Sequence, residues 1–133
     1  MNILITLPKN LVNKIISGEK KFEMRKRIPK NMKLGEDGFF VVEKGTDEVR
    51  CWCRVDKVTT LDLTITEKMA KGLSKDLCVS QKFIIDYASV STKVCLWEIS
   101  KVVITEDLCR NSLGVDKNPQ QFAYCPLSYG ESY

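Results

Sequence analysis

The chain has 133 residues, of which 44% are hydrophobic and 29% charged, and a formal net charge of +4. This length and composition predict one globular domain over residues 1–133, and the mild positive charge does not by itself identify a nucleic-acid binder. The sequence contains no histidine, which excludes a Ser-His-Asp triad, a Cys-His nucleophile and a His-bound metal. Acid–base chemistry near neutral pH must therefore use Lys, Glu, Asp, Tyr or Cys.

The first part of the chain predicts a strand, a helix and a second strand. Residues 2–7 are apolar and β-branched, as in a strand, and Pro8 suits the first turn of a helix. Apolar residues within 11–16 recur with the spacing of one helix face, and Gly18 can end the helix in a left-handed conformation. Residues 22–25 alternate in character and predict a short strand.

The rest of the chain predicts a hairpin, two helices, a long strand and an extension. Residues 39–43 and 49–58 flank a Lys-Gly-Thr-Asp turn and predict a β-hairpin. Residues 66–88 have helical spacing in two pieces with Thr and Ser caps. Residues 94–104 alternate as in a strand, and residues 109–133 form a C-terminal extension that packs on the barrel or trails from it. A compact α+β barrel or curved sheet accounts for this order.

The sequence disfavours both membrane association and metal binding. No cationic segment precedes the apolar N-terminal residues, and no apolar run approaches the roughly 20 residues that span a bilayer. We therefore expect a cytoplasmic protein without membrane contact, in which the six cysteines are reduced and mostly structural. Cys51 and Cys53 fall on one strand face and no C-x₂-C pair occurs, so neither a metal nor a cofactor is predicted.

The most informative segment is residues 18–25, Gly-Glu-Lys-Lys-Phe-Glu-Met-Arg, which leaves the first helix and enters the second strand. We expect Lys20 at the rim of a cleft, with Glu23 and Arg25 on one face of the strand. Lysine and arginine hold phosphate, and arginine also presents a planar fork to a base edge. Glu23 could orient the cations or accept a hydrogen bond from an exocyclic amine. The segment opens a basic stretch: Lys20, Lys21, Arg25, Lys26, Arg27, Lys30 and Lys33.

Gly18, Lys20, Glu23 and Arg25 match the G-x-K-x-x-E-x-R signature of ASCH domains, in its place after the first helix. The chain therefore resembles the ASCH family, which implies a PUA-like β-barrel with short helices covering its ends and a cleft into which the signature points. Members of that family are associated with RNA-linked functions, and some small members hydrolyse acetylated cytidine or cleave RNA. Residues 119–124 also resemble a Pro-Gln-x-aromatic ending of some phage and bacterial members.

The resemblance implies first a binding module whose partner is RNA or a nucleotide-like ligand. The cations of the cleft would hold phosphate, while Glu23 would read a base or hold the cations in place. The expected ligand-binding residues are Lys20, Lys21, Glu23, Arg25 and Arg27.

The alternative is a small hydrolase that acts on an acylated cytidine nucleoside or an RNA phosphodiester. Lys20 would be the nucleophile or general base, and Glu23 or Tyr124 would transfer the proton. The small amidohydrolases of the superfamily carry a Thr three residues after this Lys, where the present chain has Glu23. Because a neighbouring anion favours charged lysine, this difference favours binding over nucleophilic catalysis. A regulatory protein that uses the same scaffold to bind another protein is a third possibility.

The same residues also have ordinary structural explanations. A basic stretch is usually a solvated face, and Glu23 with Arg25 could be a surface ion pair worth under about 1 kcal/mol. Tyr87 and Tyr124 could line a cleft, because a phenol packs against apolar groups and still reaches a ligand. Core packing is the expectation for the other large aromatic residues singled out: Trp52, Phe83 and Trp97.

Overall fold

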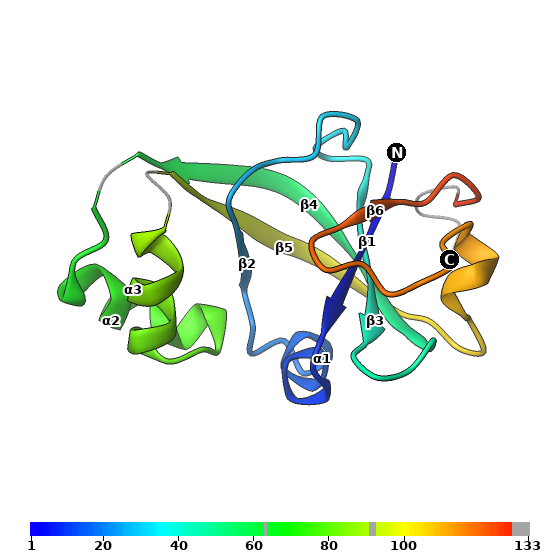
Figure 1. Cartoon of the computed structure of the whole chain (residues 1–133), viewed down its shortest axis with the longest axis horizontal. Helices are drawn as coiled ribbons and strands as arrows, with labels where there is room; N and C mark the ends of the chain where they lie inside the picture. Colours follow the sequence, from blue (N-terminus) through cyan, green and yellow to red (C-terminus); the bar gives the residue numbers. More distant parts are fainter. Residues whose placement is uncertain (63, 91–92, 129–133) are drawn as a thin grey trace.

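The computed structural model describes residues 1–62, 64–90 and 93–128, and these form one curled sheet with helices around it (Figure 1). In chain order the elements are β1 (Ile3–Leu7), α1 (Lys9–Ile16), β2 (Phe22–Arg25), β3 (Gly38–Glu43), β4 (Val49–Leu61), α2 (Glu67–Leu77), α3 (Gln81–Ser89), β5 (Val94–Ile104), the 3₁₀ turn Arg110–Leu113 and β6 (Ala123–Tyr124). The α+β class expected from the sequence is confirmed.

The strands form a half-barrel in the order β2-β5-β4-β3-β1-β6. Neighbouring strands are antiparallel except β1 and β3, which run parallel. The β4–β5 register shifts between Arg54 and Val58, and such bulges bend a strand and increase its twist. The bend lets the long strands β4 and β5 run from the main sheet to α2 and α3, which lie beyond their far ends (Figure 1).

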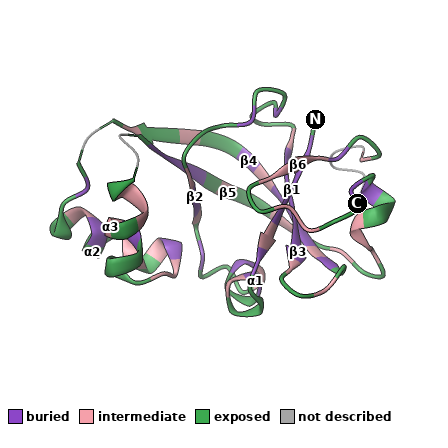
Figure 2. Cartoon of the chain, viewed as in Figure 1, coloured by how far each residue is buried: buried purple, intermediate pink, exposed green. Residues whose placement is uncertain are grey.

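The alternating residues of the strands fill separate cores on the two faces of the sheet. Cys51 and Cys53 pack with α1 on one face, whereas Trp52 packs on the other. A third cluster, which includes Leu77 and Ile84, holds α2 and α3 against β2 and β5. Buried residues accordingly run along the central strands, and the helices keep an exposed side (Figure 2).

The expected core position is confirmed for two aromatic residues and wrong for the third. Trp52 and Trp97 are buried, but Phe83 is 51% exposed. Phe83 belongs to a helix of nine residues in which Ile84 is buried, and Ile85, Tyr87 and Ala88 pack partly buried against the same core, whereas Phe83 is exposed. The helical spacing in the sequence identified the helix but assigned one apolar residue too many to its packed side.

Local features of the sequence determine how the chain leaves α1 and enters β2. Val12 and Ile15 are the buried residues of α1 and anchor it to the sheet. Gly18 adopts φ +82, the left-handed conformation expected at the helix end. The chain then turns back on the helix, because the Lys20 backbone N–H donates to the carbonyl of Lys14 at 3.0 Å. This turn aims residues 20–25 along the open edge of the sheet.

The C-terminal extension packs on the sheet as far as it is described. β6 pairs with β1, and Thr6 Oγ1 donates to the carbonyl of Pro119 at 2.8 Å. The two-residue strand β6 has no alternation that a sequence could reveal, which is why it was not expected. Residues 129–133 of the extension lie outside the described part of the chain.

All six cysteines are free thiols, and burial raises the pKa of Cys125 to about 12. Burial also raises the pKa of the Cys53 thiol, which keeps this cysteine unreactive. No helix among the described residues is long and apolar enough to cross a membrane.

Gly38 provides a test of the sheet geometry. A Cβ added there would lie 1.8 Å from the backbone oxygen of Cys53 on β4, so Gly38→Ala must push the two strands apart. We expect it to lower the free energy of unfolding by about 3 kcal/mol, the upper end for overpacking. Chemical denaturation followed by circular dichroism measures this change.

Gly72→Ala is the matched control, because a Cβ at this position in α2 meets nothing within 4 Å. It should stabilise the protein by about 0.5–1 kcal/mol, since alanine favours a helix interior. Equal stability of Gly38→Ala and the unchanged protein would contradict the β3–β4 register.

Candidate functional site

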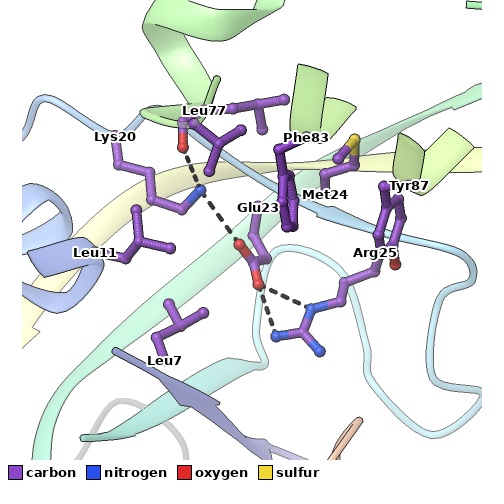
Figure 3. Close-up of a pocket in the computed structure, with 10 residues that line it drawn as sticks. Leu7, Leu11, Lys20, Glu23, Met24, Arg25, Leu77, Phe83 and Tyr87 are labelled. Atoms are coloured by element: carbon purple, nitrogen blue, oxygen red, sulfur yellow. Dashed lines mark hydrogen bonds and ion pairs between the residues drawn. The ribbon is translucent and has the colours of Figure 1, made fainter. Parts of the chain in front are cut away.

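Three charged side chains meet at the edge strand β2. Lys20 Nζ lies 3.3 Å from Glu23 Oε1, and the other carboxylate oxygen of Glu23 lies 2.7 Å from Arg25 Nη2 and 2.8 Å from Arg25 Nε. Lys20 and Glu23 are only 3% and 5% exposed. Figure 3 shows the carboxylate between the two cations, so the cluster is an ion triad with a buried Lys20–Glu23 pair and a partly exposed Arg25, rather than a surface pair.

The expected position of Lys20 at the rim of the cleft is wrong. Its ammonium group is buried and donates to the carbonyl of Leu77 at 2.7 Å (Figure 3). Leu77 is the last residue of α2, so its carbonyl has no partner within the helix. A cation is favourable at this negative end of a helix, which explains why the lysine points inward. Lys20 thus fastens α2 to β2.

Arg25 makes a corresponding link on the other side. Its Nη1 donates to the carbonyl of Gln121 at 2.9 Å, in the extension just before β6. The described contacts therefore use three of the five N–H groups of Arg25 and two of the three of Lys20. Both oxygens of Glu23 are already engaged, so the donors that remain suit a ligand rich in acceptors.

A first cavity of about 210 Å³ lies between α1 and the pair α2–α3. The triad forms one side of it, and apolar side chains form most of the remainder (Figure 3). Its lining residues are Leu7, Leu11, Lys20, Glu23, Met24, Arg25, Leu77, Val79, Phe83 and Tyr87.

A second cavity of about 220 Å³ lies on the other side of Arg25, between the end of β2 and the extension. Among the described residues that line it there are three cations, three aromatic side chains and two glutamines, and no carboxylate. Its lining residues are Arg25, Lys26, Arg27, Tyr87, Trp97, Gln120, Gln121 and Phe122.

Cations and aromatic rings are interleaved around the second cavity. Lys26 Nζ lies 5.3 Å from the ring centre of Tyr87, and the Arg27 guanidinium lies 5.8 Å from that of Phe122. Burial raises the pKa of the Tyr87 phenol, an effect that the Arg25 charge opposes. Tyr87 is thus a neutral hydroxyl near neutral pH, able to donate or accept a hydrogen bond.

The structure brings together some of the proposed site residues and leaves others apart. Lys20, Glu23 and Arg25 line the first cavity, and Arg25 and Arg27 line the second. Lys21 is exposed and lines neither, while its backbone N–H binds the carbonyl of Asp76. Tyr124 also lines neither cavity, because its hydroxyl accepts a hydrogen bond from the backbone N–H of Asn31.

Sequence reasoning missed several residues of the two cavities. Phe83 had been assigned to the core, and Leu77 contributes a backbone carbonyl, which no side-chain pattern reveals. Gln121 and Phe122 lay in the short match near the C-terminus, which gave no indication that this segment faces β2. The pairing of the extension with β1 is what carries them across to the cleft.

No protein-family model and no curated protein matches this sequence. Solved structures do match. The crystal structure of ASCH from Zymomonas mobilis has a TM-score of 0.71 at 16% identity, over 92% of this chain and 86% of that one. A single-residue variant of that protein gives a TM-score of 0.72 at 16% identity, over 92% and 87% of the two chains. The chain has the ASCH fold.

The structure of another protein agrees less closely. The crystal structure of a hypothetical protein has a TM-score of 0.53 at 16% identity, over 79% of this chain and 100% of that one. At such identities the likeness concerns the fold, and it supports the resemblance drawn from the G-x-K-x-x-E-x-R signature. Within this ASCH fold, the signature residues Lys20, Glu23 and Arg25 line the first cavity, and Arg25 also lines the second.

Burial of the triad makes a prediction about stability. Glu23→Gln keeps the shape of the side chain but leaves Lys20 buried without its counter-charge. We expect a loss of about 3 kcal/mol, the lower end for a broken buried pair because Arg25 is partly exposed. Urea denaturation of the variant measures the change.

The chain offers a closely matched control in Lys33 and Glu36. This pair has the same i,i+3 spacing and the same 3.3 Å separation, but its side chains are 71% and 65% exposed. Glu36→Gln should change stability little, because exposed pairs contribute little. Similar losses of unfolding free energy in Glu23→Gln and Glu36→Gln would show that burial does not make the triad more important for stability than an exposed ion pair.

Proposed function

We propose that this protein binds RNA or a nucleotide-like ligand in the cleft that the two cavities form on either side of Arg25. The observation that carries the proposal is the second cavity, where Arg25, Lys26 and Arg27 meet aromatic rings without any carboxylate among the described lining residues. Clustered cations attract phosphate, and aromatic faces stack on bases whatever their sequence. Few other ligands need both features at once.

Arg25 is the residue that contacts phosphate in this proposal. Glu23 holds two of its nitrogens, which fixes the plane of the guanidinium, and the remaining N–H groups are donors for an anionic oxygen. Glu23 itself has both oxygens engaged by cations, so its role is to orient Lys20 and Arg25. Base recognition then falls to the aromatic and glutamine side chains of the cavities.

Arg25→Ala tests the phosphate contact. It should weaken the binding of short single-stranded RNA by about 1–3 kcal/mol, the scale of a charge-assisted hydrogen bond. It should also reduce the slope of log affinity against log salt by about one, because fewer counterions are released. Fluorescence anisotropy at several salt concentrations measures both quantities.

Arg54→Ala is the control for Arg25→Ala. Arg54 also pairs through Nε with an acidic residue two positions away, Asp56, at 2.7 Å, but it lines neither cavity. Its replacement should leave RNA affinity and the salt slope unchanged. Equal effects of the two substitutions would mean that only the overall charge matters, and that the cleft is not the binding site.

One observation favours hydrolysis as a second candidate function. Lys20 is almost fully buried and lies 3.3 Å from Glu23, so an amine and an acid–base partner are within reach of each other beside a cavity. The proton-transfer role predicted for Tyr124 gains no support from its position, because Tyr124 lines neither cavity. The hydrogen bond from Lys20 to the carbonyl of Leu77 gives the lysine a structural role. A binding protein can use Lys20 in this role, whereas a hydrolase would need its amine for the reaction.

Glu23→Gln separates the two functions when affinity and turnover are measured on the same preparation. Under the binding function, the variant holds phosphate ligands equally well or better, because a negative charge has been removed while the amide oxygen of Gln can still accept a hydrogen bond from Arg25. Under the hydrolase function, turnover of acetylated cytidine or short RNA falls by about 10²–10⁴-fold while binding persists. Hydrolysis that disappears in both Lys20→Ala and Glu23→Gln would replace binding by catalysis as the function.

A further inference from the structure

We propose that the cleft binds two consecutive nucleotides of a single RNA strand, with one base in each cavity and the connecting phosphate on Arg25. This inference rests on the proposed function and specifies its ligand. It predicts that the smallest ligand that fills the site is a dinucleotide rather than a nucleoside or a single nucleotide.

The division of the cleft is the first argument. The two cavities share only Arg25 and Tyr87 among their described lining residues, so these two side chains form the wall between them. Their volumes are nearly equal, about 210 and 220 Å³. Each is smaller than the roughly 300–1,000 Å³ that pockets for larger organic ligands occupy. Each therefore suits one ring system, and a ligand with two ring systems can fill both.

Aromatic surfaces on both sides of the wall are the second argument. Phe83 lies against Tyr87 in the first cavity, with ring centres 6.1 Å apart and planes 20° apart, and it is half exposed. Phe122 lines the second cavity and is held edge-on by Tyr124 at 5.6 Å. Each cavity thus has an accessible ring of its own on which a base can stack.

The positions of the cations are the third argument. Arg25, Lys26 and Arg27 are consecutive, so their charges follow the chain from the dividing wall into the second cavity. Arg25 stands between the two cavities, where the phosphate that joins two stacked bases would lie. Lys26 and Arg27 are held over Tyr87 and Phe122, which places positive charge beside the path of the next phosphate.

The experiment compares ligands that differ by one feature. Isothermal titration calorimetry on the unchanged protein measures the affinity for three kinds of ligand. These are nucleoside 3′- and 5′-monophosphates, the dinucleoside monophosphates that combine them, and the same dinucleotides with an uncharged methylphosphonate linkage. We expect at least one dinucleotide to bind about tenfold or more tightly than either of its monophosphates, because a second base adds a stacking contact. The methylphosphonate form should lose most of this advantage, because Arg25 would face a neutral group.

Two variants test which cavities hold the bases. Phe83→Ala and Phe122→Ala should each lower dinucleotide affinity about fivefold or more, on the scale of one lost stacking contact. Ile104→Ala, which truncates a side chain that is 61% exposed and lines neither of the two cavities, should have no effect. Thermal unfolding confirms that all three variants fold.

The possible results separate this inference from the proposed function. Monophosphates that bind as tightly as every dinucleotide would overturn the two-nucleotide site and leave nucleotide binding standing. A dinucleotide advantage that survives both Phe83→Ala and Phe122→Ala would also overturn it, because the bases would then lie elsewhere. If neither mononucleotides, dinucleotides nor short RNA bind, both the inference and the proposed function are wrong.

Discussion

The buried carboxylate of Glu23 is the interaction on which the cleft depends. Removing a carboxylate or an ammonium from water costs several kcal/mol, so a group as buried as Glu23 needs partners that satisfy both of its oxygens. Lys20 and Arg25 provide these partners from the same short segment. Each then donates a further N–H group to a distant backbone carbonyl, Lys20 to that of Leu77 and Arg25 to that of Gln121. One negative charge thereby connects β2 to α2 on one side and to the extension on the other.

These connections matter because the half-barrel is open between its edge strands β2 and β6. Edge strands carry backbone groups that invite pairing with other chains unless something covers them. Here the extension lies across the opening, and Arg25 fastens it to β2 through Gln121. The second cavity occurs at this crossing and the first occurs where Lys20 fastens α2. The two cavities are thus consequences of how the triad closes an incomplete barrel.

The same arrangement explains why binding and hydrolysis involve the same residues. A lysine buried beside a carboxylate resembles an acid–base pair, yet it also resembles a clamp that holds the end of a helix. The contact between Lys20 and Leu77 favours the clamp, because it directs the ammonium to a carbonyl that already needs a donor. The cations that line the second cavity instead face a hollow without carboxylates among the described residues, as a surface for phosphate requires.

Local sequence patterns determined the elements and the charged motif, and tertiary structure decided what the motif faces. The helical spacing before Gly18 and the alternation in residues 94–104 depend on neighbours in the sequence, so both elements were predicted with nearly correct bounds. The G-x-K-x-x-E-x-R residues were likewise recognisable, because strand alternation places Glu23 and Arg25 on one face.

The inward turn of Lys20, the exposure of Phe83 and the approach of Gln121 were not predictable in this way. Each depends on residues more than 50 positions apart in the sequence or on the packing of a whole helix. A local sequence pattern carries no information about which distant backbone carbonyl will need a hydrogen-bond donor. The sequence by itself therefore determined which charges are available, and only the folded chain decided that they meet in one triad and that Arg25 stands between two cavities.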